Sequence, residues 1–177
     1  MSTTIVVEEE EAVDVLSDKT ELIIRRPTLE DIDFVIENIR NEDLVETRAL
    51  GGKTVRECLE TTPDIERNAW VWENNGVVIC IFGVNPIVGG DHLGVIWLLA
   101  TKFFDDNSIT FAFKCKPIVK DVIKLFKYVF NYVYAENRKS IRWLKWLGFN
   151  VCKAEPIGKN GAKFHRFEMW NDECVIQ

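Results

Sequence analysis

The stretch that decides the fold runs from Ala135 to Phe149 and reads Ala-Glu-Asn-Arg-Lys-Ser-Ile-Arg-Trp-Leu-Lys-Trp-Leu-Gly-Phe. Asn137 can cap a helix, because its side-chain oxygen can accept from the free backbone N–H groups of the first turn. Apolar residues then recur at helical spacing: Ile141, Leu144 and Leu147. Gly148 can end the helix in a left-handed conformation. With the strand-like run 128–134 before it, the stretch predicts a strand, a capped helix and a new strand that begins at Phe149.

Composition restricts the class of protein. The chain has 177 residues, 47% of them hydrophobic, which is typical of one globular domain with a substantial core. No apolar run reaches the length of a membrane span, and the N-terminus lacks the basic and apolar regions of a signal peptide. Residues 1–20 instead carry Glu8-Glu9-Glu10-Glu11, and we expect an acidic, solvated arm there. The folded domain is expected over residues 21–177.

Cysteine, histidine and charge exclude further classes. The five cysteines are scattered without a Cys-x-x-Cys pair, at Cys58, Cys80, Cys115, Cys152 and Cys174. An odd, spread set favours buried thiols in a reducing cytoplasm over a disulfide framework. The only histidines are His92 and His165, so we expect no metal site. The net charge of −6 gives no global sign of nucleic-acid binding, although Lys and Arg are locally dense in the second half.

Turn signals and apolar runs divide the first half of the chain. Leu22 to Thr28 is predicted to be a short strand that Pro27 ends. Thr28 is predicted to cap a helix, with acidic residues in the first turn and the apolar face Leu29, Ile32, Val35, Ile36 and Ile39. A second short helix is predicted over Thr54 to Leu59. Two strands, 69–73 and 77–82, flank Asn74-Asn75-Gly76, which is a strong hairpin signal.

The second half continues this alternation. Leu93 to Ala100 is apolar throughout, as expected of a central strand that is covered on both faces. A helix is predicted over Ser108 to Phe126, with Asn107 or Ser108 as its cap. Pro117 lies inside that span and either kinks the helix or starts it. After the opening strand and helix, the last two strands are predicted over residues 149–154 and 162–170.

This order of elements resembles the GNAT family of acetyl-CoA-dependent N-acetyltransferases, from Leu22 to Trp170. The resemblance rests on the spacing of Asn137 and Gly148, on Gly148-Phe149, and on the opening pattern Arg25-x-x-Thr28-x-x-Asp31. An ordinary helix with an Asn cap and a Gly stop is the simpler explanation of the first motif. The resemblance implies a single α/β domain with a mixed, mostly antiparallel sheet and helices on both faces.

The resemblance also implies a place for a cosubstrate. In the GNAT family the fourth and fifth strands splay apart, and the pantetheine arm of coenzyme A pairs with the free edge of the fourth strand. By position, that edge would be Leu98, Leu99 and Ala100. Together with Asn137, these residues are the cofactor-binding candidates if acetyl-CoA binds.

The family's pyrophosphate loop is missing. GNAT enzymes carry a Gly-rich loop at the start of the next helix, where free N–H groups converge on the phosphates. Residues 101–118 contain no glycine here. Asp105 and Asp106 would repel a pyrophosphate, and Lys114 and Lys116 would compensate only in part. The acidic pair is also well explained as two ordinary acidic residues before a helix that Asn107 or Ser108 caps. We therefore expect no cofactor, with acetyl-CoA as a cosubstrate only if the protein is active.

The catalytic residues are also incomplete. Many GNAT enzymes carry a Tyr seven residues after the Asn, and this position is Leu144 here. Losing a general acid typically costs about 10²–10⁴ in rate. Candidate bases are Glu73, Asp91 and His92. Each has a simpler explanation, because Glu73 flanks the hairpin and the other two belong to the turn before the fourth strand.

A narrower resemblance concerns Asn131-Tyr132-Val133, Asn137, Ile141-Arg142-Trp143-Leu144-Lys145 and Gly148. These residues resemble a GNAT-like branch of short-tailed phages that is encoded with the internal virion proteins and associated with virion assembly. That branch likewise lacks the Gly-rich loop and has Leu in place of the Tyr. The resemblance implies virion or assembly proteins as partners, with location in the host cytoplasm or the virion.

Trp143 and Trp146 have two possible surroundings, the protein core or an exposed patch. Both rings can fill the core beside Ile141, Leu144 and Leu147. Alternatively, they form an exposed aromatic patch beside Arg138, Arg142 and Lys145 that suits a protein partner. Three functions follow as hypotheses: a phage assembly protein with weak or lost acetyl transfer, an active N-acetyltransferase with a variant phosphate site, and a host-directed inhibitor.

Overall fold

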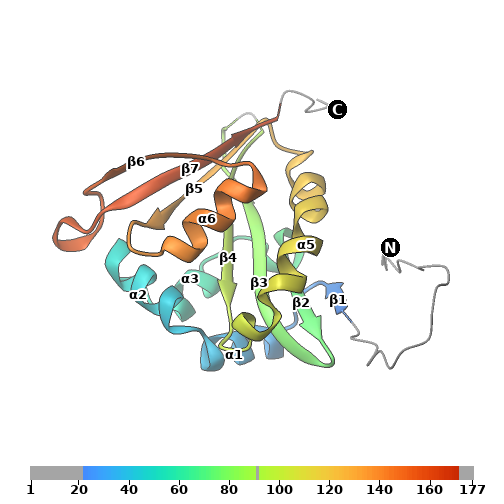
Figure 1. Cartoon of the computed structure of the whole chain (residues 1–177). Helices are drawn as coiled ribbons and strands as arrows, with labels where there is room; N and C mark the ends of the chain where they lie inside the picture. The colour runs from blue at the N-terminus through green and yellow to red at the C-terminus, as the bar shows by residue number, and fades with distance from the viewer. Residues whose placement is uncertain (1–21, 91, 172–177) are drawn as a thin grey trace.

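The computed structural model describes residues 22–90 and 92–171, so the expected acidic arm and Asp91 lie outside the described residues. The elements in chain order, labelled in Figure 1, are β1 (Leu22–Arg25), α1 (Leu29–Asn38), α2 (Asn41–Leu50), α3 (Val55–Glu60), α4 (Ile65–Asn68), β2 (Ala69–Asn74), β3 (Val77–Pro86), β4 (Leu93–Ala100), α5 (Phe104–Ile123), β5 (Tyr128–Tyr134), α6 (Arg138–Leu147), β6 (Asn150–Glu155), the 3₁₀ turn η1 (Lys159–Gly161) and β7 (Phe164–Trp170).

One sheet of seven strands runs through the described residues, in the order β1-β2-β3-β4-β5-β7-β6. Every neighbouring pair is antiparallel except β4 and β5, which are parallel. Parallel neighbours need a crossover connection, and α5 supplies it. The prediction of a mixed, mostly antiparallel sheet is confirmed.

Helices cover both faces of this sheet, as predicted. On one face, α5 and α6 lie side by side and pack on a core that includes Phe111, Leu144 and Leu147 (Figure 1). On the other face, residues of α1, α3 and α4 pack on a second core around Val35 and Leu59. The two cores bury the two sides of β3 and β4, which explains why β4 is apolar at nearly every position.

The predicted caps are present. Thr28 forms a capping box with Asp31, and Thr54 forms one with Glu57. The Asn137 side chain accepts from the Ser140 N–H, and Gly148 ends α6 at φ 102°. Asn75 and Gly76 both have positive φ, 48° and 77°, as a tight hairpin requires.

Three features differ from the sequence prediction. α5 begins at Phe104, before the expected Asn107 or Ser108 cap, and its N-cap residue Phe103 makes no side-chain cap. Asp105 and Asp106 therefore lie in its first turn, where acidic side chains favour the helix dipole. Pro117 lies inside this helix and does not start it. Helices α2 and α4 were not predicted, because α4 is one turn long and α2 presents polar residues to the interior.

Within the described part of the chain, no helix has both the length and the apolar character needed to cross a membrane.

Candidate functional site: the fork between two strands

The site is a fork between β4 and β5. The two strands pair only over Leu93–Val95 and Tyr128–Phe130. At the next position the Asn131 side chain donates a 2.8 Å hydrogen bond to the backbone oxygen of Ile96, so a side chain replaces the missing strand pairing. Beyond this point the strands diverge around a groove of about 680 Å³. Residues of α2, α5 and α6 complete its walls.

The connection between α1 and α2 closes one end of the fork. Ile39 forms an antiparallel bridge with Thr101. The Arg40 N–H donates to the Ala100 oxygen at 2.9 Å, and the Lys102 N–H donates to the Asn38 oxygen at 2.8 Å. This connection therefore pairs with the end of β4 as a short additional strand.

The backbone groups on the open edge of β4 are largely occupied. Because N–H and C=O directions alternate along a strand, Ile96, Leu98 and Ala100 point to the fork, whereas Leu99 points to β3. Asn131 occupies the Ile96 oxygen, and Arg40 occupies the Ala100 oxygen. Of the three residues that face the fork, Leu98 differs from the other two. Within the part of the chain that the structure describes, its backbone makes no hydrogen bond across the fork.

Asp43 occupies the backbone N–H of Ala100, at the end of β4. Its Oδ2 accepts a 2.7 Å hydrogen bond from the Ala100 N–H, and its Oδ1 accepts from Arg40 Nη2 at 2.8 Å. Asp43 is 6% exposed. Burial raises the pKa of the Asp43 carboxyl, and the charge of Arg40 and both hydrogen bonds oppose that shift. The arrangement is a buried ion pair attached to a strand edge.

A second carboxylate, Glu46, links the two sides of the groove. Its Oε2 accepts a 3.1 Å hydrogen bond from the side-chain amide of Asn137 on α6. Burial raises the pKa of Glu46, and the charge of Asp43 adds to the rise, while the hydrogen bonds from Asn137 and the Tyr134 backbone oppose it. Asn137 therefore both caps α6 and holds a carboxylate with an elevated pKa inside the groove.

This polar side of the groove was not predicted from the sequence. Four residues of α2 line the groove: Asp43, Glu46, Thr47 and Leu50. Their spacing of three, four and seven residues is that of one helix face. Because that face is mainly polar, its residues show no apolar periodicity that would indicate a helix packed against the protein. The helical spacing of these side chains between Asn41 and Gly51 was the available signal.

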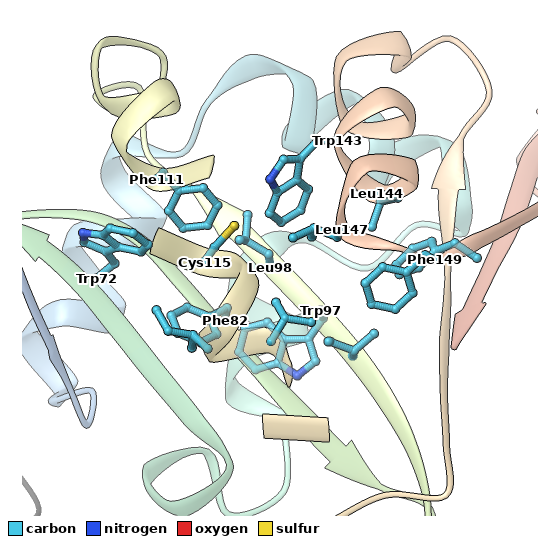
Figure 2. Close-up of a pocket in the computed structure, with 14 residues that line it drawn as sticks. Trp72, Phe82, Trp97, Leu98, Phe111, Cys115, Trp143, Leu144, Leu147 and Phe149 are labelled. Carbon is cyan, nitrogen blue, oxygen red and sulfur yellow. The ribbon is translucent and has the colours of Figure 1, made fainter. Parts of the chain in front are cut away.

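An aromatic cluster fills the space between α5, α6 and the sheet (Figure 2). Phe111 is 3% exposed, and its ring centroid lies 4.5 Å from Trp72, 4.8 Å from Phe104 and 5.5 Å from Trp143. The Arg40 guanidinium lies 5.0 Å from the Phe104 ring. An apolar crevice of about 70 Å³ remains beneath Phe111 and Trp143 and adjoins the groove through shared lining residues such as Leu98.

The other predicted site residues are spread over the molecule. Leu98 lines both the groove and the crevice, and Leu144 is buried between them. Glu73 accepts a 2.7 Å hydrogen bond from Arg25 and is not among the residues that line the groove. His92 lies in the turn before β4, with its Nδ1 3.4 Å from the Leu125 oxygen. Asp91 is outside the described residues.

The two tryptophans of α6 are in different surroundings. Trp143 packs into the aromatic cluster, whereas Trp146 is 44% exposed with Lys116 Nζ 4.9 Å from its ring.

Within the described residues, no group of three or more His, Cys, Asp or Glu side chains could hold a metal ion.

Comparison with known proteins identifies the fold, through solved structures and not through sequence. No family model and no curated protein sequence matches the chain. Solved structures do. A spermidine N-acetyltransferase from Vibrio cholerae, in complex with CoA and spermine, is 14% identical and has a TM-score of 0.66, over 86% of this chain and 97% of that one. A putative acetyltransferase from Salmonella typhimurium with its cofactor acetyl-CoA, yncA, is 20% identical at TM-score 0.66, over 86% and 95%.

A ribosomal-protein-alanine N-acetyltransferase from Brucella melitensis is 16% identical at TM-score 0.65, over 84% of this chain and 99% of that one. The chain therefore has the fold of the GNAT acetyltransferases, along nearly the whole length of each of these three proteins. At this level of identity the likeness concerns the fold.

Proposed function

We propose that this is a GNAT-fold protein of a short-tailed phage, that it serves virion assembly or internal-core formation, and that its acetyl-transfer chemistry is weak or lost. The observation that carries the loss of chemistry is the occupied edge of β4. A pantetheine arm needs free backbone groups there. The Ala100 N–H instead binds Asp43, and the Ala100 oxygen binds the Arg40 N–H.

The start of α5 supports the same proposal. A pyrophosphate needs converging N–H groups without side chains in the way. The turn before α5 carries Phe103, and its first helical turn carries Phe104, Asp105 and Asp106. Phe104 and Asp105 also line the groove, so an acidic side chain and an aromatic ring obstruct the place where the phosphates would bind.

Leu144 removes the general acid. It is 6% exposed and contributes to the apolar core beneath α6. A hydrocarbon side chain in this place cannot protonate a thiolate. The groove that remains is one of ligand size, between about 300 and 1,000 Å³.

The role in assembly rests on the motif of residues 131–148 and on the exposure of Trp146. Aromatic side chains and Arg are enriched in protein interfaces. Arg142 and Lys145 lie on the same exposed side of α6 as Trp146. Virion proteins are the partners that this resemblance implies.

An active N-acetyltransferase is the second candidate, and Glu46 is the observation that favours it. A carboxyl whose pKa is raised by burial is suited to accept a proton from an ammonium group near neutral pH. Glu46 lines the groove next to Asn137. In this candidate function Glu46 replaces the bases predicted from the sequence.

Calorimetric titration distinguishes the two functions. We expect no heat of binding for acetyl-CoA or ADP at 1 mM, a concentration chosen to detect about −4 kcal/mol of binding free energy. Micromolar acetyl-CoA binding that is lost in Leu98→Pro, which removes the unoccupied N–H of the β4 edge, would contradict the first function and favour the N-acetyltransferase. ADP tests the phosphate site alone, and binding of ADP would contradict the blocked start of α5.

The assembly role needs its own experiment. Mass spectrometry of purified virions, with pull-down of virion proteins by wild type and by Trp146→Ala, tests it. We expect virion proteins to be recovered by wild type and lost in the variant, with Trp170→Ala, at a more exposed aromatic residue, as the control. Recovery of a host protein instead, lost in Trp146→Ala, would indicate a host-directed inhibitor.

A further inference from the structure

Basic side chains are concentrated on the outer side of α5 and α6. Residues 113–127 contain five lysines and one aspartate, and α6 contains four basic residues and no acidic residue. The part of this surface that joins the two helices consists of Phe113, Lys116, Lys120, Arg142, Lys145 and Trp146. We call it the α5/α6 basic face. Figure 1 shows the two helices adjacent on one side of the sheet.

This face combines charge with exposed aromatic area. Phe113 is 74% exposed and Trp146 is 44% exposed. Lys116 Nζ lies 4.9 Å from the Trp146 ring and so joins the two helices across the face. Among the described residues, no salt bridge reaches Lys116, Lys120, Arg142 or Lys145; the acidic partners nearby pair with Lys124 and Lys139. An occupant of this face should therefore be acidic and partly apolar.

The chain itself contains such a segment. Residues 1–21 carry seven acidic residues and one lysine, so this segment accounts for the whole net charge of −6, and residues 22–177 are neutral overall. Apolar residues flank the Glu8–Glu11 run on both sides: Ile5, Val6, Val7, Val13, Val15 and Leu16. Charge and apolar content both match the α5/α6 basic face.

The chain between Glu11 and β1 is long enough for the Glu8–Glu11 run to reach the α5/α6 basic face. Glu11 precedes Leu22, the first residue of β1, by eleven positions, and an extended chain of that length spans about 36–40 Å. A folded domain of this size has a radius of gyration of about 15 Å. Because the segment is tethered, its effective concentration at the face is of millimolar order, well above that of a free acidic partner.

We propose that the acidic segment of residues 1–21 binds the α5/α6 basic face of its own chain, with Glu8–Glu11 against Lys116, Lys120 and Arg142 and with its apolar residues against Phe113 and Trp146. The segment then covers Trp146 and competes with any acidic partner for that face. The contact is electrostatic at exposed positions, so it weakens as salt screens it.

The test is ¹⁵N NMR of the full-length protein in 50 mM NaCl. The variant carries four neutralising substitutions: Glu8→Gln, Glu9→Gln, Glu10→Gln and Glu11→Gln. We expect the Trp146 indole N–H and the amides of residues 113–120 and 142–147 to shift, while the β2–β3 hairpin does not. Raising NaCl to 500 mM in wild type should produce the same shifts.

A matched control changes the same number of charges elsewhere. It carries Glu37→Gln, Glu60→Gln, Glu66→Gln and Glu155→Gln, all at exposed positions. These substitutions should leave the Trp146 indole signal unchanged. If the two variants shift the signal equally, the effect is one of net charge and the proposal fails.

Charge reversal gives a second, independent measurement. Lys116→Glu with Arg142→Glu should release the segment and shift the signals of residues 5–16. Adding Glu9→Lys and Glu10→Lys should restore the salt dependence of the Trp146 indole signal that the charge reversal removes. Failure of this restoration overturns the pairing, and shifts that depend on protein concentration overturn binding within one chain in favour of a second copy.

Discussion

The carboxylate of Asp43 accepts a 2.7 Å hydrogen bond from the backbone N–H of Ala100, although 57 residues separate the two in sequence. A side chain of α2 thereby accepts a hydrogen bond from the edge of β4, at the end where β5 has diverged from β4. The same carboxylate neutralises Arg40, whose backbone N–H binds the Ala100 oxygen. The stability of the fork and the occupation of the Ala100 backbone groups therefore both depend on the Asp43–Arg40 pair.

Asp43→Ala should destabilise the protein by about 3–5 kcal/mol, the usual cost of leaving a buried charge without its partner. The substitution also leaves the buried Ala100 N–H without an acceptor. The free energy of unfolding from urea titration measures the loss. The double variant Arg40→Met with Asp43→Leu should recover part of it, because neither charge then remains buried. A double variant that is no more stable than Asp43→Ala would contradict this account.

The free energy of unfolding of Glu46→Gln should increase relative to that of wild type as pH rises above 4.5, the ordinary pKa of a Glu carboxyl. The folded-state pKa of Glu46 is raised, so the folded protein holds its proton longer than the unfolded chain. Wild-type stability therefore falls through the window above the unfolded pKa and levels off above the folded one. Gln keeps an acceptor for Asn137 but has no charge. Urea unfolding between pH 4 and pH 8 measures the difference.

Glu57→Gln is the control of opposite sign. The hydrogen bonds from the backbone and side chain of Thr54 lower the pKa of Glu57, so its contribution is present above the unfolded pKa and is lost as pH falls. Relative to wild type, this variant should become less stable as pH rises. The same direction of change for both variants would contradict the assigned causes.

Phe111→Ala should cost about 3–5 kcal/mol, because it removes a buried ring from the aromatic cluster and leaves a cavity. It should also join the crevice to the groove, which increased binding of a fluorescent apolar dye to the folded protein would report. Phe113→Ala, two residues along the same helix and 74% exposed, is the matched control and should stay within about 0.5 kcal/mol of wild type. Equal losses at the two positions would mean that Phe111 is not the residue that fills the space.

Gly148→Ala should cost about 1–2 kcal/mol through backbone strain alone. Gly148 has φ 102°, and an added Cβ would meet only Met169 Cε at 3.8 Å, an ordinary contact. Gly148→Asn should cost less, since Asn tolerates the left-handed region better. Thermal unfolding monitored by circular dichroism compares the variants, and an Asn variant less stable than the Ala variant would indicate a steric cause.

Local signals were sufficient for most of the fold. Thr28, Thr54 and Asn137 cap helices where the sequence predicts caps, and Asn75-Gly76 forms the predicted turn, because each acts on backbone groups within a few residues. α5 differed at its start, since no side chain caps it and its position follows from the connection after β4.

The candidate site was less predictable because it is built from long-range contacts. Leu98, Ala100 and Asn137 are at the fork, as the family resemblance implied by position. The groups that occupy this fork, Asp43 and Glu46, come from a helix whose inner face is polar. Nothing local indicates that their side chains point inward. The direction is set by the pairing of residues 38–40 with the end of β4, which includes the bridge between Ile39 and Thr101.

That bridge has an evolutionary consequence. Only Ile39 and Arg40 connect α1 to α2, and Ile39 is fixed against Thr101. Inserting or deleting one residue after Ile39 would turn α2 by about 100°, since a helix has 3.6 residues per turn. Asp43, Glu46 and Thr47 would leave the groove together. The polar content of this groove can therefore be lost or regained through a single insertion or deletion, without a series of point substitutions, and related chains should differ here in length before they differ in residue type.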